Sequence, residues 1–286
     1  MEERNERGET LEEFLARYDE TQYRRPSNTV DMILLTVLKG KLKVLLVKRK
    51  DHPFIHDWAM PGGFVNFDED LDAAMKRELE EETNLFDSTY FRQLYTFGNA
   101  DRDPRTRVIT TVYLSMTPAE NIKMTSAGDD AMDTGWFTIQ KITMTTDGHE
   151  RKSILMLDEE EKEIHLRYEI YDTACDNYVQ TRSKLLESSN AKLAADHIKA
   201  INMAIDVVRN RAASTGIMFN LLPKECTLRE IQEVYEAIVN HPVDTGNFRR
   251  DIKKMLVATG NTTIVNGRKV ATYSFNPLLP FVKETL

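Results

Sequence analysis

Residues 63–85, GFVNFDEDLDAAMKRELEEETNL, decide the fold of the first part of this chain. On a helix each residue advances about 100° around the axis, which places four apolar residues on one face: Leu71, Ala74, Met75 and Leu79. Glu78 and Glu82 fall on that same face, whereas a solvated helix keeps its acids opposite the apolar stripe. The sequence therefore predicts a helix over residues 71–83 whose carboxylates have a specific task.

The charge pattern of this predicted helix favours a bound cation. Glu80, Glu81 and Glu82 crowd the last turn, where the helix dipole is already negative, and Glu78 one turn earlier adds to the repulsion. Carboxylates at this spacing provide the hard oxygen ligands that Mg²⁺ or Mn²⁺ prefers, and the backbone carbonyl of Gly63 can join them. The predicted metal ligands are Gly63, Glu78, Glu81 and Glu82.

Taken alone, an acidic helix end is usually a solvated surface. Here the spacing resembles the Nudix box, G-x5-E-x7-R-E-U-x-E-E-x-G-U with U apolar, at eight of its nine defined positions. Asn84 stands where the family has glycine. Asparagine also adopts the left-handed conformation that closes a helix, so we expect this departure to be tolerated.

The resemblance implies an α/β fold, an α/β/α sandwich with a mixed sheet, and a catalytic role for the box. Glu78, Glu81 and Glu82 would be metal ligands or, for one of them, the base acting on water. Glu69 would support the metal site, and Arg77 would orient a glutamate. The family reaction is hydrolysis of a nucleoside diphosphate linked to another group, in which Mg²⁺ or Mn²⁺ neutralises the charge of the two phosphates.

Strand and helix patterns extend the prediction along the chain. We expect strands at 32–38, 42–47, 94–97, 108–116 and 136–139, with Trp136 in the core, and a helix at 192–211. Residues 153–171 predict a hairpin around an acidic turn, which is either a dimerisation device or, as we favour, a surface elaboration. Three parts are expected: an N-terminal extension (1–25), a Nudix domain (26–212, with the hairpin at about 150–172) and a last domain (213–286) after a linker near Ala212 to Gly216.

Two arginines suggest how a substrate would be held. Arg102 and Arg105 lie on a predicted loop, where they either bind phosphate or ribose oxygens or form an ordinary exposed turn. Gly62 and Gly63 allow a ligand to approach the backbone closely. Together with residues 57–65 and with Gly128 to Ala131 before Trp136-Phe137, this loop resembles the ADP-ribose-directed branch of Nudix proteins. That resemblance implies ADP-ribose or a related NAD-derived ligand.

The last domain has the pattern of a winged helix-turn-helix. Helices are predicted at 227–238 and 245–256, and two short strands flank Asn266-Gly267, a hairpin signal. Between residues 244 and 270 six Lys or Arg stand against two Asp, a balance of +4 within a chain of net charge −8. Such side chains suit double-stranded DNA, although a protein-interaction domain remains open. The predicted DNA contacts are Asn247, Arg249, Arg250, Lys253, Lys254, Arg268 and Lys269.

Composition bounds the remaining possibilities. At 286 residues and 41% apolar content the chain suits two ordinary domains, and its charged first twenty residues and lack of a long apolar run favour a cytoplasmic protein that does not enter the membrane. Cys175 and Cys226 lack metal-ligand spacing, so both are expected to be plain thiols.

A Nudix domain followed by such a unit resembles the Nudix-related transcriptional regulators of NAD metabolism and sugar use. The likeness includes the segment 193–197, in which His197 is expected to be a packed or capping residue rather than a ligand. The first hypothesis is a homodimeric, DNA-binding regulator that binds ADP-ribose and retains hydrolysis. The second is a Mg²⁺-dependent pyrophosphatase whose last domain serves only dimerisation or folding.

Overall fold

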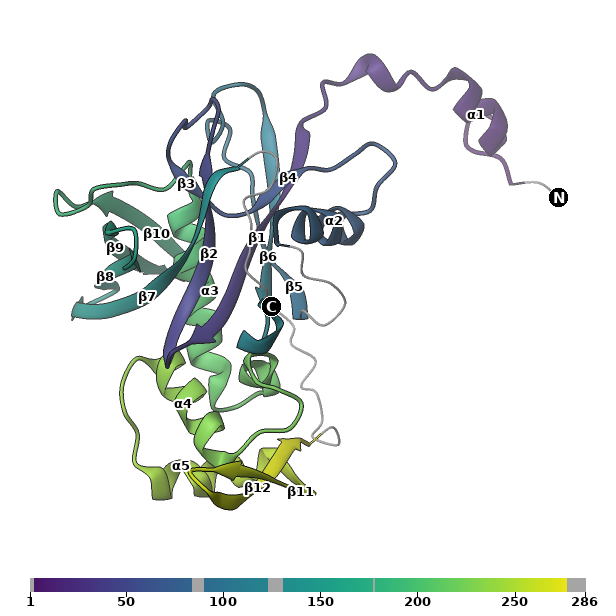
Figure 1. Ribbon diagram of the computed structural model, residues 1–286. Helices are drawn as coiled ribbons and strands as arrows, with labels where there is room; N and C mark the ends of the chain where they lie inside the picture. The colour runs from purple at the N-terminus through teal and green to yellow at the C-terminus, as the bar shows by residue number, and fades with distance from the viewer. Residues whose placement is uncertain (1–2, 84–89, 123–130, 177, 277–286) are drawn as a thin grey trace.

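The computed structural model describes residues 3–83, 90–122, 131–176 and 178–276 (Figure 1). The end of the predicted box, Asn84 and Leu85, and the acidic loop Gly128 to Asp130 lie outside these ranges.

One mixed sheet organises the first domain, in the order β10-β9-β8-β7-β2-β1-β6-β5, with short β3 on β2 and β4 on β1. β1 and β6 are parallel, and the other neighbours are antiparallel. The strands are β1 Ser27–Leu38, β2 Lys41–Arg49, β3 Trp58–Ala59, β4 Gly62–Phe64, β5 Tyr90–Phe97, β6 Val108–Met116, β7 Ala131–Asp147, β8 Glu150–Glu159, β9 Ile164–Cys175 and β10 Tyr178–Leu185.

Two helices cover opposite faces of this sheet, as Figure 1 shows: α2 (Leu71–Thr83) and α3 (His197–Ala212). Alternation along β1 explains the layering, because successive side chains of a strand point to opposite faces. Val30, Met32 and Leu34 pack with α2, whereas Ile33 and Leu35 belong to the core under α3. The expected three-layer α/β fold is confirmed, and Trp136 packs, partly buried, against the core on the α2 side.

The region expected to be a surface elaboration is part of the core. β8 and β9 continue the main sheet beyond β7, and every second residue is buried from Ser153 to Glu159 and from Leu166 to Asp172. Leu155, Leu157, Leu166, Tyr168 and Ile170 join the same cluster as α3. The expectation was wrong because a half-buried strand and a surface hairpin share the same local pattern, and only tertiary packing separates them.

The connection to the last domain is not a free linker. α3 begins at His197 rather than at Lys192, since Leu193 forms a bridge with Trp58 of β3. After α3 the chain forms the 3-10 helix η3 (Gly216–Leu221), whose Ile217, Met218 and Leu221 are buried. These residues lie in one hydrophobic cluster that extends from the sheet into the last domain.

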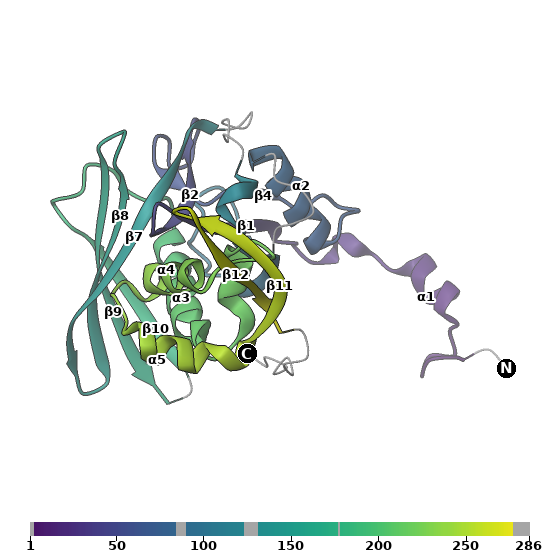
Figure 2. The same cartoon turned by 60° about the horizontal axis from the view of Figure 1, so that its bottom comes forward.

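The last domain contains α4 (Leu228–Val239), α5 (Thr245–Ile252), the 3-10 helix η4 (Lys253–Met255) and the hairpin β11 (Leu256–Val265) and β12 (Arg268–Phe275), seen in Figure 2. Thr227 and Glu230 form a capping box at the start of α4. The second helix is shorter than expected because the chain tightens into η4 before entering β11. Asn266 and Gly267 have φ of 49° and 75°, as the predicted hairpin turn requires.

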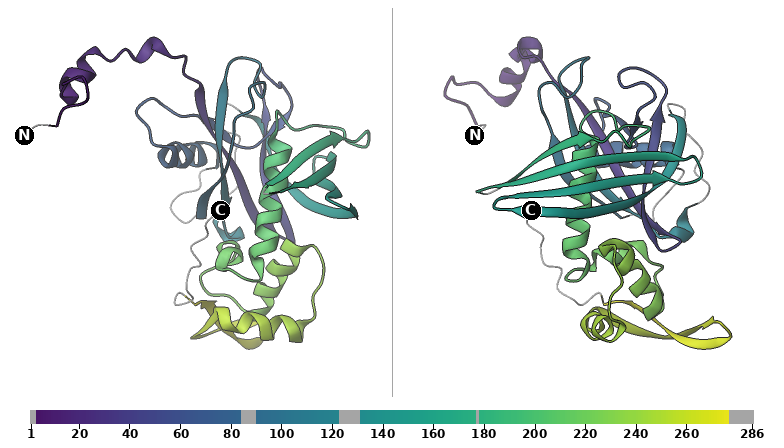
Figure 3. Two further views of the ribbon diagram at one scale, coloured as in Figure 1. Left: turned by 180° about the vertical axis from the view of Figure 1, so that it is seen from behind. Right: turned by 90° about the vertical axis from the view of Figure 1, so that its left-hand side faces the viewer.

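The remaining elements are α1 (Leu11–Arg17), η1 (Glu20–Gln22) and η2 (Ala119–Asn121). The N-terminal segment with α1 extends away from the body of the molecule, as Figure 3 shows from two sides. Among the described residues no helix is both long and apolar enough to span a membrane.

We predict that β8 and β9 contribute strongly to stability. Leu157→Ala empties a fully buried position and should lower the free energy of unfolding by about 2–5 kcal/mol in urea titrations. Val179→Ala, on the exposed surface of β10, should change it by less than about 0.5 kcal/mol. Equal effects of the two substitutions on the free energy of unfolding would contradict the assignment of β8 and β9 to the core.

Candidate functional site

A cleft of about 900 Å³ lies where β4, α2, two loops and the start of α3 meet. It brings together most of the predicted site residues of the first domain. From the predicted set, its lining includes Gly62, Gly63, Arg77, Glu78, Glu81, Glu82, Arg102 and Arg105. Glu69 does not line the cleft, but it forms hydrogen bonds with Arg77, which does. Its volume is within the range of small-molecule sites.

The two glycines of β4 are required by close contacts. A β-carbon on Gly63 would lie 2.1 Å from Oε1 of Glu78, and one on Gly62 would lie 2.2 Å from the carbonyl oxygen of Val30. Gly62 also has a φ of 153°, which side chains rarely adopt. The Pro61-Gly62-Gly63 loop can therefore approach the carboxylate of α2 only because it has no side chains.

Arg77 organises the acids of the box. Its guanidinium binds Glu69 at 2.9 and 3.0 Å in a two-pronged contact, Glu78 at 2.7 Å and Glu81 at 3.2 Å, and it donates to the carbonyl of Phe64. These hydrogen bonds hold the pKa of the Glu69 carboxyl below its usual range. Burial raises the pKa of Glu78, although Arg77 opposes the shift.

The donor set fits a divalent metal ion. Glu78 and Glu82 are both nearly buried on the cleft side of α2, and a divalent cation would offset the cost of burying two carboxylates there. The bare backbone of Gly63 leaves room beside Glu78. Within the described part of the chain, no three acids, histidines or cysteines stand close enough to hold a metal as they are. Arg77 binds Glu78 and Glu81, so these side chains would have to turn toward the ion.

The two loop arginines have different surroundings. Arg102 is nearly buried between Asp196, at 2.9 Å, and Asp31, at 3.8 Å. Arg105 is half-exposed, pairs with Asp103 and lies over the ring of Phe64 at 5.5 Å. The alternative of an ordinary exposed turn is therefore wrong for Arg102.

Some lining residues were not predicted. Asp31 comes from β1, and Lys48, Arg49 and Lys50 come from the end of β2 and the residue after it, where they place positive charge at the cleft. His197, which was expected to be a packed residue, is buried: its Nδ1 accepts a hydrogen bond from the backbone N–H of Met60 at 2.9 Å, and burial lowers its pKa. The three successive basic residues Lys48, Arg49 and Lys50 before a loop could have indicated a ligand-binding role from the sequence. No sequence pattern indicated Asp31.

A second candidate surface lies on α5 and the β11–β12 hairpin, at the opposite end of the molecule from β4 (Figure 1). All seven residues predicted to contact DNA are exposed, while Phe248 and Ile252 of α5 point into the core. Arg250 pairs with Asp251. Within the described ranges, Arg249, Lys253, Lys254, Arg268 and Lys269 have no carboxylate in salt-bridge range, which leaves them free for phosphates.

Comparisons with known proteins agree with this arrangement. The NUDIX domain family matches residues 26–157, and the NrtR DNA-binding winged helix domain family matches residues 218–275. The ADPR responsive transcriptional repressor NtrR of Acinetobacter baylyi is 28% identical over 92% of this chain and 87% of its own. The ADP-ribose pyrophosphatase of Methanocaldococcus jannaschii is 35% identical over 45% of this chain and 72% of its own.

A solved structure shows the same combination of domains. The crystal structure of Shewanella oneidensis NrtR complexed with a 27mer DNA has a TM-score of 0.58 and 26% identity to this chain, and the match covers 87% of this chain and 93% of that one. The second domain is thus a winged helix, as predicted.

We predict that Gly63 is essential to the box for steric reasons. In Gly63→Ala the new β-carbon must displace the Glu78 carboxylate, so Mn²⁺ affinity measured by electron paramagnetic resonance should fall about tenfold or more. Gly98→Ala is the matched control, since its β-carbon would meet atoms no closer than 3.9 Å. Unchanged Mn²⁺ affinity in Gly63→Ala would contradict this role.

Proposed function

Because this chain belongs to the Nudix family and carries an NrtR-type winged helix domain, we propose that it is a transcriptional repressor that responds to ADP-ribose and also hydrolyses it. The observation that carries the proposal is the pairing, in one chain, of an intact acidic cleft with an exposed basic face. The relative named as an ADP-ribose-responsive repressor matches across both parts.

The residues of the cleft divide the chemical work. A bound Mg²⁺, held by Glu78, Glu81, Glu82 and the Gly63 carbonyl, would neutralise the diphosphate and lower the pKa of water. Glu69 and the carbonyl of Phe64 fix Arg77, and Arg77 in turn orients the glutamates. Of the acids, Glu82 is our candidate for the base that takes the proton of the attacking water, because it lies nearly buried in the cleft, whereas Arg77 holds both Glu78 and Glu81.

Ligand selection is assigned to the basic rim of the same cleft. Arg105 lies over the ring of Phe64, and Lys48 and Arg49 at the end of β2 line the same cleft. Arginines suit phosphate and ribose oxygens because of their planar, two-pronged donors. An elongated nucleotide with two phosphates and a second ribose matches a cleft whose rim is basic and whose floor is acidic.

The basic face of the last domain is assigned to double-stranded DNA. Arg249, Arg250 and the hairpin tip at Arg268 and Lys269 would contact phosphates, and Asn247 near the start of α5 would reach a base edge. A repressor of this kind would act in the cytoplasm as a homodimer on a two-fold operator. The second candidate, a pyrophosphatase whose last domain serves only dimerisation or folding, is favoured by the retained box glutamates and Arg77 alone.

Hydrolysis is tested with Glu82→Gln. Wild type should release AMP from ADP-ribose in the presence of Mg²⁺, EDTA should stop the reaction, and Glu82→Gln should lower kcat by about 100-fold or more. Glu80→Gln, on the same helix but exposed, should retain wild-type activity. The catalytic assignment fails if wild type is inactive or if Glu82→Gln keeps full activity.

DNA binding is tested by removing two positive charges from α5. Arg249→Ala combined with Arg250→Ala should abolish the gel shift of the protein's own upstream DNA and leave hydrolysis intact. With residual binding, the slope of log affinity against log salt should shrink by about 2. Arg229→Ala, an exposed site on α4, should leave the shift unchanged. No shift by wild type at low salt would select the pyrophosphatase instead.

A further inference from the structure

We propose that α3 transmits ligand binding from the cleft to the winged helix domain, and that Arg209 is the positioning residue that fastens α3 to that domain. The inference deepens the proposed function and rests on it, because it names the route by which a nucleotide in the cleft alters the DNA-binding face. The contacts at the two ends of α3 carry it.

The first end of α3 is tied to the cleft. Two backbone hydrogen bonds, Trp58 N–H to the Lys192 carbonyl at 3.0 Å and Ala194 N–H to the Trp58 carbonyl at 2.8 Å, join it to β3. His197, the first residue of α3, accepts from Met60 just before the Pro61-Gly62-Gly63 loop. Any movement of the cleft floor is therefore passed directly to the start of the helix.

An anion in the cleft would compete for a further contact at the start of α3, the ion pair between Arg102 and Asp196. Arg102 lines the cleft, and Asp196, the N-cap residue of α3, holds its guanidinium at 2.9 Å. A diphosphate offers the same guanidinium more negative charge and more acceptor oxygens than one carboxylate. When Arg102 turns to a phosphate, Asp196 loses its partner and the start of α3 is released from its ligand-free position.

The body of α3 can carry such a change as a rigid unit. Its 16 residues span about 24 Å, and a continuous apolar face that includes Ile201, Ile205 and Val208 is fully buried. Asp206 adds a polar anchor by accepting from Lys141 of β7 at 2.6 Å. Shifts of about 1–2 Å along packed helices are a common way for proteins to switch state.

At its far end, α3 holds α4 through Arg209. The Nε of Arg209 donates to the Ile238 carbonyl at 2.9 Å, and its Nη1 donates to the Lys141 carbonyl at 3.2 Å. Ile238 is in the last turn of α4, where carbonyls lack partners within the helix. One guanidinium thus joins three elements: α3, the last turn of α4 and β7.

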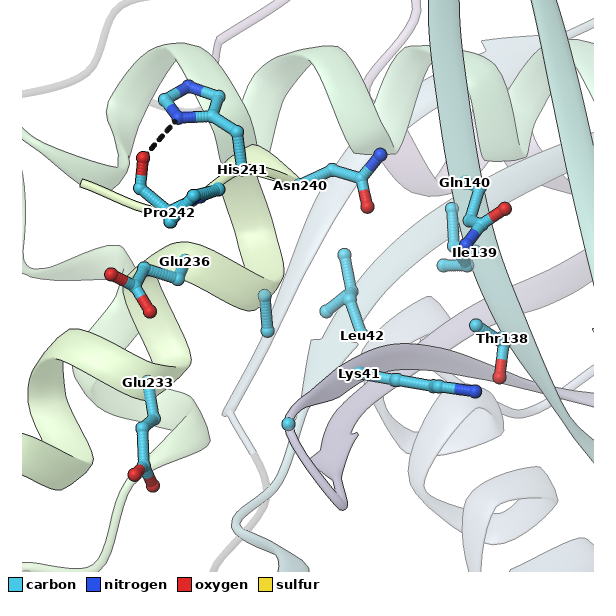
Figure 4. Close-up of a pocket in the computed structure, with 12 residues that line it drawn as sticks. Lys41, Leu42, Thr138, Ile139, Gln140, Glu233, Glu236, Asn240, His241 and Pro242 are labelled. Carbon is cyan, nitrogen blue, oxygen red and sulfur yellow. Dashed lines mark hydrogen bonds between the residues drawn. The ribbon is translucent and has the colours of Figure 1, made fainter.

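The seam beside this contact leaves space for α4 to move. A pocket of about 310 Å³ that opens to solvent separates Glu233, Glu236 and Asn240 of the α4 side from Leu42 and from residues 138–140 of β7 (Figure 4). A tightly packed interface would resist displacement because protein interiors have few voids. α4 packs Ile231, Val234 and Ile238 into the core, but on this side it faces an open pocket, and Arg209 holds its last turn there.

Movement of α4 would carry the DNA-binding helix with it. Glu236 of α4 accepts from the N–H of Val243 at 3.0 Å, Gln232 donates to Thr245 of α5 at 3.2 Å, and the rings of Tyr235 and Phe248 lie 5.2 Å apart. Arg209 therefore controls, through α4, the direction in which Arg249 and Arg250 point.

The test is hydrogen exchange of residues 228–252, with and without Mg²⁺ and α,β-methylene ADP-ribose, which resists hydrolysis. In wild type the analogue should change amide exchange in α4 and α5 by about fivefold or more. Arg209→Met keeps an unbranched apolar stem in place of the arginine methylenes but has no donors. In this variant the change should fall below about twofold, while calorimetric affinity for the analogue stays within about twofold of wild type.

Two further variants sharpen the result. Arg229→Met, the same substitution on the exposed surface of α4, should respond like wild type. Asp196→Asn frees Arg102 without a ligand, so exchange in α4 should shift in the direction that the analogue produces in wild type. This variant keeps the test valid if Arg209→Met does not fold.

The outcomes separate the two proposals. A full ligand response in Arg209→Met, an unshifted Asp196→Asn, or no response in a wild type that binds the analogue would overturn transmission through α3 and leave the proposed function standing. A wild type that fails to bind the analogue would overturn both.

Discussion

Burial of both faces of β1 is the constraint on which this structure depends. The strand alternates between two cores, so it can exist only with α2 on one side and α3 on the other. Its parallel partner β6 and the antiparallel β4 fix the edge at which the box loop meets α2. The cleft therefore follows from the sandwich: the acids come from one layer, the glycines from the sheet and His197 from the other layer.

Local periodicity carried much of the prediction. The spacing of Ala74, Met75 and Leu79 specified the helix, its buried face and the side on which Glu78 and Glu82 lie, because all of these depend on residues within one or two turns. Leu71, expected on the same face, is exposed at the start of the helix. The turn at Asn266-Gly267 was equally readable, since few residues adopt positive φ at two successive positions. Features set by neighbours in sequence were thus accessible without coordinates.

Features set by distant partners were not accessible. The environment of Arg102 depends on Asp196, far along the chain, and nothing near the loop announces that partner. The burial of β8 and β9 depends on their packing against α3, which no local pattern in residues 153–171 indicates. In each case the deciding contact joins residues that are far apart in the sequence. Local propensity therefore predicted solvent exposure where the structure shows burial.

The hydrophobic cluster that runs from the sheet through α3 and η3 into the winged helix domain has a consequence for how the protein unfolds. Because Ile217, Met218 and Leu221 are shared by both halves, neither half can lose its structure without exposing apolar surface of the other. Heating should thus produce a single cooperative transition rather than two. Cutting the chain between the halves would leave each fragment with an exposed apolar surface that favours self-association.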